Sequence, residues 1–377
     1  MCLKHPAINL ISGLKYTRRP LSNLKSGSHS IAKILVTGAT GFVGSHILQA
    51  LMNLQHADLQ IVAACRQPEK LLPHYRGEVR RGDLRDPDYL DRVLAGIDII
   101  CHAAGWSSFE NAGKNKHRAY LEPTIDLINR AVEWRVSRFV NLSSVFVTTF
   151  SQRNNASAKG KPRSYWPMIN NLIAVEEYLA NYHSRSQFVN LRIGLYSGKR
   201  LNMGLLPLLL ARSTRAYMPY INGPPGYMPL IDGRDIGQAF CRAALAPLDA
   251  TCTSLNISGP DTPSQADVMH FIRQQTGHSP LNTGLPSMIA SPLLWLRGLI
   301  QKQENQPLFT LAMLNMLKSP EIDNRQASNI LGYDPEISWQ ASLLETLESY
   351  KNQSLNKNLS QTVRDLNIPR SPDSPGI

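Results

Sequence analysis

From residue 33 onward, the apolar and polar positions follow two patterns that alternate along the chain. Short apolar runs of strand length are followed by longer stretches in which apolar residues recur at helical spacing. This alternation is typical of a parallel sheet with crossover helices, and it predicts an α/β, doubly wound domain of the Rossmann type. Strands are expected at Lys33–Thr37, Leu59–Cys65, Glu78–Arg81, Ile97–His102, Arg138–Leu142 and Phe188–Ile193, with helices at Phe42–Gln55, Thr124–Trp134 and Tyr165–Tyr182.

After Gly194 the pattern changes. Pro219–Pro229 is rich in proline and glycine and predicts a loop. Further elements are expected as a helix at Asp235–Leu245, a strand at Leu255–Ser258 and a helix at Gln265–Gln275. We therefore divide the chain into a basic, flexible extension (1–30), an α/β domain (31–195), a smaller C-terminal lobe interleaved with it (196–350) and a disordered polar tail (351–377).

The turn after the first predicted strand reads Thr-Gly-Ala-Thr-Gly-Phe-Val-Gly. Its three glycines would make a tight turn, let the backbone approach a pyrophosphate, and permit close packing of helix on strand. The N-terminus of the next helix presents unpaired N–H groups and the positive end of the helix dipole to phosphates. The order of strand, turn and helix predicts that the first domain binds NAD or NADP, whereas an ordinary glycine-rich turn is the alternative. The expected contacts are Gly38, Thr40, Gly41, Phe42, Val43 and Gly44.

The end of the second predicted strand is where such a domain usually contacts the adenosine ribose. An acid there would accept hydrogen bonds from the 2′-hydroxyl, but this chain reads Ala64-Cys65-Arg66. A guanidinium suits a 2′-phosphate, which it binds through bidentate, charge-assisted hydrogen bonds. Arg66, with Lys70 nearby, therefore favours NADP over NAD. The alternative is that Arg66 is only solvated.

Charge and cysteine content narrow the choice of partners. The formal net charge is +12, but no run of Lys and Arg gathers it, so we expect no nucleic-acid partner and do not favour contact with a membrane surface. The five cysteines form no C-x-x-C pair, which argues against a metal site and a disulfide framework and fits a reducing compartment. No apolar stretch has the length needed to span a bilayer.

The first thirty residues are basic, and the first acid of the chain is Asp58. This composition resembles an organelle presequence but lacks the apolar core of a secretory signal. The simpler explanation is a flexible extension or a start codon placed too far upstream. We expect a cytoplasmic protein, with organelle targeting by this extension as the alternative.

Several segments, taken in order, resemble the extended short-chain dehydrogenases/reductases. The most similar groups are the NAD-dependent epimerase/dehydratase, dihydroflavonol reductase and 3β-hydroxysteroid dehydrogenase groups, and the resemblance spans about residues 31–350. The segments are TGATGFVG (37–44), GDLRDPD (82–88), CHAAG (101–105), RFVNLSS (138–144), NLRIGLYSG (190–198), PLIDGRDIGQAF (229–240), LNISGPD (255–261) and LGYDPEISW (331–339).

The resemblance implies roles for particular residues. Asp83 and Leu84 would border the adenine, and the cofactor cleft would be lined by His102, Ala103 and Ala104. The arginines of RFVNLSS and NLRIG would be structural or cofactor-adjacent. The second lobe would close over a substrate, and a homodimer built on a pair of helices is usual in the family.

The chain differs from this family at the catalytic residues. There, a tyrosine acts as general acid/base, a lysine four residues later lowers its pKa, and a serine positions the reacting oxygen. Ser144 matches the serine, but no Tyr-x-x-x-Lys occurs anywhere in the sequence. Met168 and Leu172 stand where the tyrosine and lysine belong, and neither can exchange a proton. Tyr165, one turn earlier, is the candidate substitute, with packing at a helix start as its alternative role. The helix that usually begins Asn-x-x-Gly-Thr begins here with Tyr120.

Two hypotheses of different classes follow. The first is an atypical NAD(P)-dependent reductase, epimerase or dehydratase for a hydroxyl/carbonyl or nucleotide-sugar-like substrate, using Ser144, Tyr165 or a group of the substrate itself. The second is a dinucleotide-binding sensor or scaffold without turnover. His102 is a titratable group near the cleft, but its place at a strand end favours a structural histidine over a catalytic base.

Overall fold

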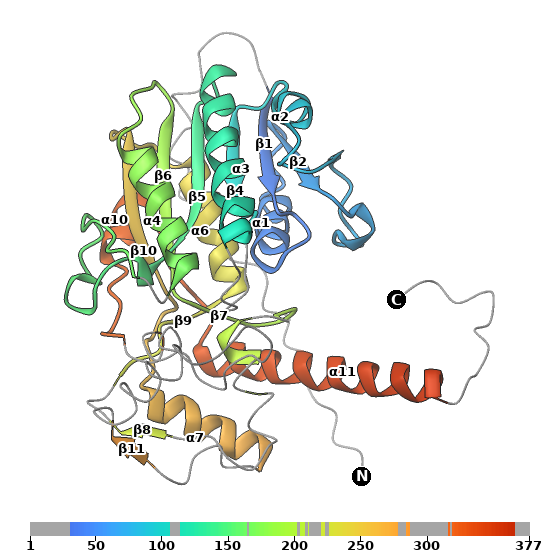
Figure 1. The fold of residues 1–377 in the computed structure, drawn as a ribbon, viewed down its shortest axis with the longest axis vertical. Coiled ribbons are helices and arrows are strands. Elements are labelled where there is room, and N and C mark those ends of the chain that lie inside the picture. Colours follow the sequence, from blue (N-terminus) through green and yellow to red (C-terminus); the bar gives the residue numbers. More distant parts are fainter. Residues whose placement is uncertain are drawn as a thin grey trace.

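The computed structural model describes residues 31–105, 114–163, 166–201, 204–207, 210, 220–222, 226–277, 284–286, 316 and 319–365. Within them, seven parallel strands form one sheet with helices on both faces, and a smaller lobe lies beyond one end of the strands (Figure 1). The predicted doubly wound α/β fold is therefore confirmed.

The central sheet has the strand order β10-β6-β5-β4-β1-β2-β3, and every neighbouring pair is parallel. The chain runs outward from β1 to β3 and then crosses to β4 on the other side of β1. Ligands of such sheets bind at this reversal, outside the carboxyl ends of the strands. The strands are β1 (Ala32–Thr37), β2 (Leu59–Cys65), β3 (Glu78–Arg81), β4 (Ile99–His102), β5 (Arg138–Ser144), β6 (Gln187–Ile193) and β10 (Cys252–Ile257).

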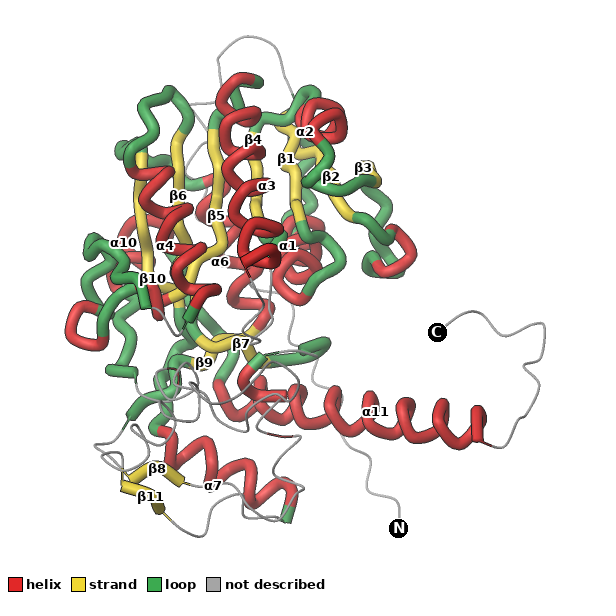
Figure 2. The backbone as a smooth tube through the Cα atoms, viewed as in Figure 1, coloured by secondary structure: helices red, strands yellow, loops and turns green. Residues whose placement is uncertain are grey.

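Two layers of helices cover the sheet (Figure 2). Successive side chains of β1 point to opposite layers, because side chains alternate across a strand. Ile34 and Val36 join the core on one side, and Leu35 joins the core on the other. The first layer consists of α1 (Phe42–Asn53) and α6 (Gly233–Leu245), and the second of α2 (Pro87–Leu94), α3 (Lys114–Glu133) and α4 (Pro167–Ala180).

The second lobe begins directly after β6 and has its own apolar core. Val145 and Phe146, which follow β5, and Leu195, which follows β6, belong to this core, so the lobe faces the carboxyl ends of the strands. Helix α11 extends sideways from the body of the molecule (Figure 1). The elements are β7 (Leu195–Ser197) paired with β9 (Leu230–Asp232), β8 (Tyr220–Asn222) paired with β11 (Gly284–Pro286), α7 (Gln265–Thr276), α10 (Arg325–Leu331) and α11 (Trp339–Asp365).

The structure differs from the predicted elements at three helices, and it also contains β7, β8, β9, β11 and α10, for which no element was predicted. Helix α3 begins at Lys114 rather than Thr124 and contains Pro123. Helix α2 was not predicted from the sequence. Asp86 was a signal for it, because its side chain caps the first turn by accepting a hydrogen bond from the backbone N–H of Asp88. Helix α11 continues to Asp365, so residues 351–365 are helical where a disordered tail was expected. A polar composition does not by itself distinguish a solvated helix from a disordered chain.

Candidate cofactor and active site

Two of the three glycines after β1 are required by the packing of the chain on itself. Gly38 has a φ of +64°, in the left-handed region that favours glycine, and a Cβ there would lie 2.6 Å from the carbonyl oxygen of Ala103. It would also lie 2.7 Å from the backbone nitrogen of Ala104. A Cβ on Gly44 would overlap the carbonyl oxygen of Gly38. The turn therefore brings β1, β4 and α1 into close contact at the point where the strand order reverses.

Gly41 is the glycine that this packing does not require. It is the N-cap of α1 with a φ of −79° and a ψ of 173°, which any residue can adopt, and an added Cβ would meet only the carbonyl oxygen of Gly38, at 3.2 Å. Glycine offers no side chain to cap the N–H groups of the first turn, near Phe42 and Val43, and that turn carries no acid. Thr40, Gly41, Phe42 and Val43 lie at the N-terminal end of α1, and we call this end the cofactor mouth. It suits an anionic group such as a pyrophosphate.

His102 is buried at the end of β4 and holds neighbouring elements together. Its Nδ1 lies 2.9 Å from the hydroxyl of Thr37 on β1, and its Nε2 lies 3.4 Å from the hydroxyl of Thr124 on α3. Burial lowers the pKa of His102 to about 4, so the ring is neutral at physiological pH. The Thr37 hydroxyl in turn accepts the N–H of Ala104, at 3.3 Å. His102 therefore connects β4 with β1 and α3 at the carboxyl end of the strand.

Arg66 follows β2 directly and is exposed over 73% of its side chain. Its guanidinium lies 3.9 Å from a carboxylate oxygen of Asp83, which follows β3. Asp83 also accepts two hydrogen bonds from the side chain of Arg85, and these bonds lower its pKa to about 2. Arg81 pairs with Cys65 in the sheet. Two arginines, Arg66 and Arg85, thus lie against one carboxylate at the strand ends where an adenosine ribose is expected. Leu84 packs against the core on the α2 side.

Ser144 ends β5 and begins a short 3₁₀ helix, Val145–Val147. Its hydroxyl oxygen accepts the backbone N–H of Phe146, at 3.3 Å. Tyr165, the predicted substitute for the missing tyrosine, lies outside the described residues. Met168 and Leu172 are half-buried on α4 and pack against the core of the second lobe. These two positions, where the resemblance implies the family's acid/base pair, therefore make apolar contacts.

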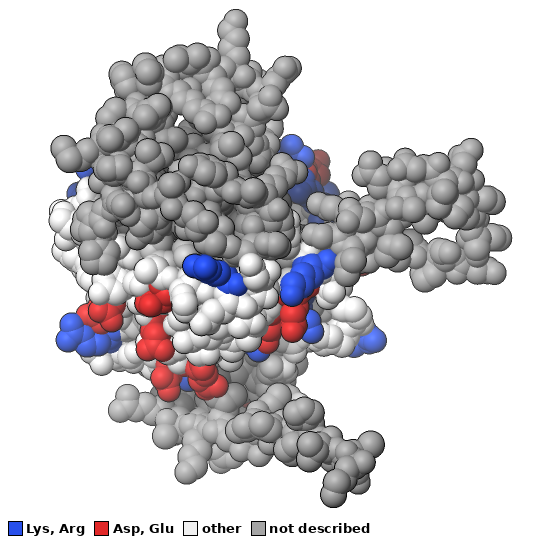
Figure 3. All heavy atoms as spheres, turned by 90° about the horizontal axis from the view of Figure 1, so that it is seen from below, with Lys and Arg blue, Asp and Glu red and all other residues white. Residues whose placement is uncertain are grey.

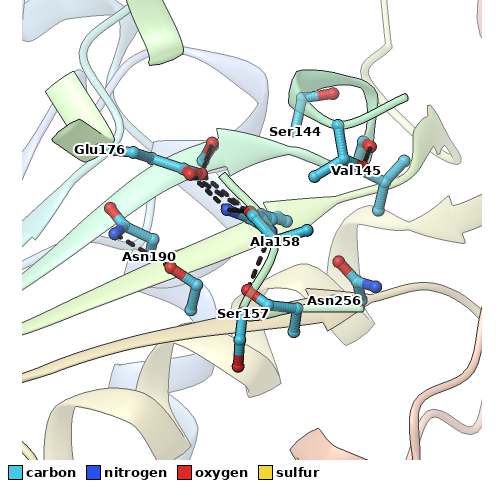
Figure 4. Close-up of polar contacts among 12 residues, drawn as sticks. Ser144, Val145, Ser157, Ala158, Glu176, Asn190 and Asn256 are labelled. Carbon is cyan, nitrogen blue, oxygen red and sulfur yellow. Dashed lines mark hydrogen bonds and ion pairs between the residues drawn. The ribbon is translucent and has the colours of Figure 1, made fainter. Parts of the chain in front are cut away.

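A buried polar cluster fastens the loop after β5 to the sheet (Figure 4). Arg192 on β6 binds Glu176 on α4 at 2.6 Å, and both side chains are almost fully buried. The guanidinium also donates to the carbonyl oxygens of Ala156 and Ala158, each at 2.9 Å. On the neighbouring strand, Asn256 donates to the carbonyl oxygen of Arg153 at 2.7 Å. The arginine of NLRIG is therefore structural.

The arginine of RFVNLSS is also structural. Arg138 on β5 donates through Nη1 to the carbonyl oxygens of Ala243, Ala244 and Ala246, at 3.0, 2.9 and 2.7 Å. These carbonyls end α6, and a cation at a helix C-terminus is favoured by the helix dipole. Arg138 therefore caps α6 at the end of the sheet away from the glycine turn.

Two tyrosine side chains near the ends of β1 and β4 were not singled out as site residues from the sequence. The ring of Tyr196, on β7, stacks on the ring of Phe42 with centroids 5.8 Å apart. Tyr120, on α3, comes within 4.0 Å of the position that a Cβ on Gly105 would take. Burial raises the pKa of Tyr120 and of Tyr196. The absence of the usual Asn-x-x-Gly-Thr pattern at Tyr120 could have singled out that residue from the sequence. Tyr196 can be recognised only from the fold, which brings its ring onto that of Phe42.

Other kinds of site find little support in the described part of the chain. Among these residues, no group of three His, Cys, Asp or Glu side chains is placed to hold a metal ion. Over the same ranges, no helix has the length and apolar character needed to cross a membrane. On the face drawn in Figure 3, the described acidic and basic side chains lie interspersed among uncharged ones.

Comparison with known proteins by sequence gives a consistent picture. The model of the NAD dependent epimerase/dehydratase family matches residues 34–257. A 3 beta-hydroxysteroid dehydrogenase/Delta 5-->4-isomerase of Mycobacterium tuberculosis is 27% identical over 157 residues, which cover 40% of this chain and 41% of that protein. A UDP-glucose 4-epimerase of Neisseria meningitidis serogroup B is 37% identical over 81 residues, covering 19% of this chain and 24% of that protein. The matches thus span less than half the length of these relatives.

Solved structures extend the similarity over most of the chain. The UDP-glucose 4-epimerase of Thermus thermophilus, solved in complex with NAD, superposes with a TM-score of 0.62 at 17% identity. The superposition covers 85% of this chain and 99% of that one. At this level of identity the similarity establishes the fold.

Proposed function

We propose that this chain, which belongs to the NAD dependent epimerase/dehydratase family, holds NADP at the mouth of α1 and uses it on a hydroxyl/carbonyl or nucleotide-sugar-like substrate. The observation that carries the proposal is Gly41. A Cβ on Gly38 or Gly44 would overlap backbone atoms of the chain, whereas a Cβ on Gly41 would make a single close contact, 3.2 Å from the carbonyl oxygen of Gly38. A glycine that the fold does not require is explained by the close approach of a pyrophosphate to the backbone.

The residues around the strand ends support NADP rather than NAD. Arg66 and Arg85 both lie against a single acid, Asp83, and Arg85 already binds that acid through two hydrogen bonds. Arg66 is therefore placed to bind a 2′-phosphate by charge-assisted hydrogen bonds. Where an NAD site would carry an acid after β2, this chain carries a cation. When bound, the cofactor would supply hydride chemistry to the cleft.

The second lobe supports a substrate role for the cleft. Its core packs on segments that directly follow β5 and β6, so a molecule bound beside the cofactor would lie between the lobe and Ser144. Ser144 would orient the reacting oxygen, and Tyr165 is retained as a candidate acid. The alternative is a dinucleotide-binding sensor or scaffold without turnover. A cytoplasmic location and a homodimer also stay predictions.

The proposal is tested by contrasting two glycines of the same turn. Gly41→Val should lower the unfolding temperature far less than Gly44→Val does, and it should abolish the binding of NADPH, measured by calorimetry and by the fluorescence of the reduced nicotinamide. Gly44→Val should unfold the domain, because its side chain meets the backbone of Gly38. If wild-type protein gives no heat and no fluorescence change with NADPH or NADH, or if Gly41→Val binds as tightly as wild type, the proposed function is wrong.

A further inference from the structure

Arg200 follows β7 at the start of the second lobe, and its backbone is strained. Its φ is +72°, in the left-handed region that non-glycine residues rarely occupy. Gln55 and Arg135 also have a left-handed φ, but they follow the ends of α1 and α3, where this conformation is common. Arg200 ends no helix, and strained residues of this kind cluster at functional sites.

Hydroxyl groups of α11 hold the strained turn in place. The backbone N–H of Arg200 donates to the Oγ of Ser349 at 3.3 Å. The backbone N–H of Gly198, two residues earlier, donates to the Oγ1 of Thr346 at 2.7 Å. Thr346 and Ser349 are three residues apart and therefore share one face of the helix. The conformation of Arg200 is thus fixed by the packing of α11 on the turn.

The guanidinium of Arg200 has no hydrogen-bond or ion-pair partner among the residues that the structure describes, and its Nε is buried. Burial lowers the pKa of Arg200 and Asp232 opposes this effect, but a guanidinium stays charged in proteins. Asp232 is itself already bound. It accepts hydrogen bonds from the side chain of Arg234 at 2.7 and 3.0 Å and from the hydroxyl of Ser342 at 2.6 Å. A buried charged donor without a partner is unfavourable, so Arg200 points to an anion that the chain does not supply.

A series of contacts connects Arg200 with the cofactor mouth. The ring of Phe42, in the mouth, meets the ring of His46 edge-on with centroids 4.7 Å apart. The His46 ring lies against Gly233, where an added Cβ would overlap it, and Gly233 directly follows Asp232. Burial and then the charge of Arg200 lower the pKa of His46 to about 4. The guanidinium, which acts on both His46 and Asp232, therefore lies near the first turns of α1 and α6.

We propose that Arg200 binds a phosphate group, and that through it the second lobe holds a ligand at the cofactor mouth. This inference deepens the proposed function and rests on it for the position of the cofactor. The diphosphate of the dinucleotide is one source of the phosphate, and a phosphorylated substrate is the other. The planar fork of a guanidinium fits phosphate oxygens, and the N-terminus of α1 favours the same anion.

The contact is read directly from the Nε of Arg200. Full-length protein labelled with ¹⁵N-arginine is titrated by NMR with NADPH, and then with inorganic pyrophosphate after saturation with NADPH. The Nε–H resonance of Arg200, assigned by its loss in Arg200→Lys, should move downfield when a phosphate oxygen accepts its proton. Arg242 is the matched control, because its Nε is also buried without a partner but lies in the last turn of α6. Its resonance should not move.

Arg200→Gly separates binding from structure. Glycine adopts the left-handed conformation readily, so the unfolding temperature of the variant should stay close to that of wild type. The affinity for the phosphate probe should fall by about tenfold or more, the effect of losing charge-assisted hydrogen bonds. A loss for NADPH assigns the phosphate to the cofactor. A loss for pyrophosphate alone assigns it to a substrate.

The outcomes distinguish this inference from the proposed function. If wild type binds NADPH but the Arg200 resonance moves with neither probe, the inference alone is overturned. Unchanged affinity for both probes in Arg200→Gly also overturns it. If wild type binds no NADPH, the proposed function fails, and pyrophosphate added to the free protein then tests Arg200 by itself. A resonance that does not move in that titration overturns the inference as well.

Discussion

The ring of Tyr196 stacks on the ring of Phe42, with centroids 5.8 Å apart and planes inclined by 28°. Both side chains pack against two cores at once, the core beneath α1 and α6 and the core of the second lobe. Phe42 belongs to the cofactor turn, and Tyr196 belongs to the first segment that leaves the sheet. The pair therefore connects the cofactor mouth physically to the lobe that would cover a substrate.

Removing this contact should destabilise the fold. Phe42→Ala is expected to lower the free energy of unfolding by about 2 kcal/mol, less than a fully buried phenylalanine because the ring is only half-buried. Urea unfolding followed by circular dichroism measures the change. The matched control is Phe150→Ala, whose ring is 54% exposed, and its cost should stay below about 1 kcal/mol. Equal costs for the two variants would mean that the stack contributes nothing beyond an exposed ring.

The choice between NADP and NAD should depend on Arg66. Arg66→Asp is expected to weaken NADP binding by about 10- to 100-fold, the value of a charge-assisted contact, and to leave NAD binding nearly unchanged. Calorimetry with both dinucleotides measures the difference. Arg185→Asp, an exposed arginine just before β6 at the opposite end of the sheet, is the control and should affect neither. Equal losses for NADP and NAD in Arg66→Asp would refute the assignment of the 2′-phosphate.

Much of the fold was predictable because the local pattern of apolar and polar residues indicates the same strands that the structure contains. The predicted ranges for β2 and β3 match the observed strands, since short runs bounded by turn residues leave little choice of register. The glycine turn was also predictable, because strand, turn and helix are consecutive in sequence. In contrast, the role of Tyr196 depends on its stacking partner Phe42, which lies far away along the chain. No local pattern encodes that contact.

The buried pair of Glu176 and Arg192 illustrates the same limit. The two residues lie on α4 and β6, and each could equally have been a solvated charge when read from sequence. Only the packing of α4 on the sheet brings them to 2.6 Å and turns the arginine toward the loop carbonyls. The resemblance implied that Arg192 is either structural or cofactor-adjacent. Its contacts with Glu176 and the loop carbonyls show that it is structural.

Breaking this pair should loosen the loop that it holds. Arg192→Met is expected to cost about 3–5 kcal/mol, because it leaves the Glu176 carboxylate buried without its cation. Hydrogen exchange should then accelerate at the amides of residues 153–158. The double variant Glu176→Gln/Arg192→Met should be less destabilised than the sum of the two single variants. Additive costs would show that the two side chains do not act as a pair.

The neutral state of His102 predicts how stability depends on pH. Its pKa is about 4 in the folded protein and about 6.5 when unfolded, so the unfolded chain binds more protons between these values. His102 therefore costs about 2 kcal/mol of stability on acidification from pH 6.5 to pH 5. Asp235 acts in the opposite sense, because burial raises its pKa to about 7, and His46 acts in the same sense as His102.

The contribution of His102 must therefore be isolated by a variant, and His102→Gln is suitable because its amide can still bind the Thr37 hydroxyl. Urea unfolding at pH 7 and pH 5 should show that wild type loses more stability on acidification than His102→Gln does, by about 2 kcal/mol. Asp235 and His46 are present in both proteins, so their effects cancel in this comparison. If the two proteins lose stability in parallel, His102 is not held neutral by burial, and a role for it as a proton acceptor in the cleft would have to be reopened.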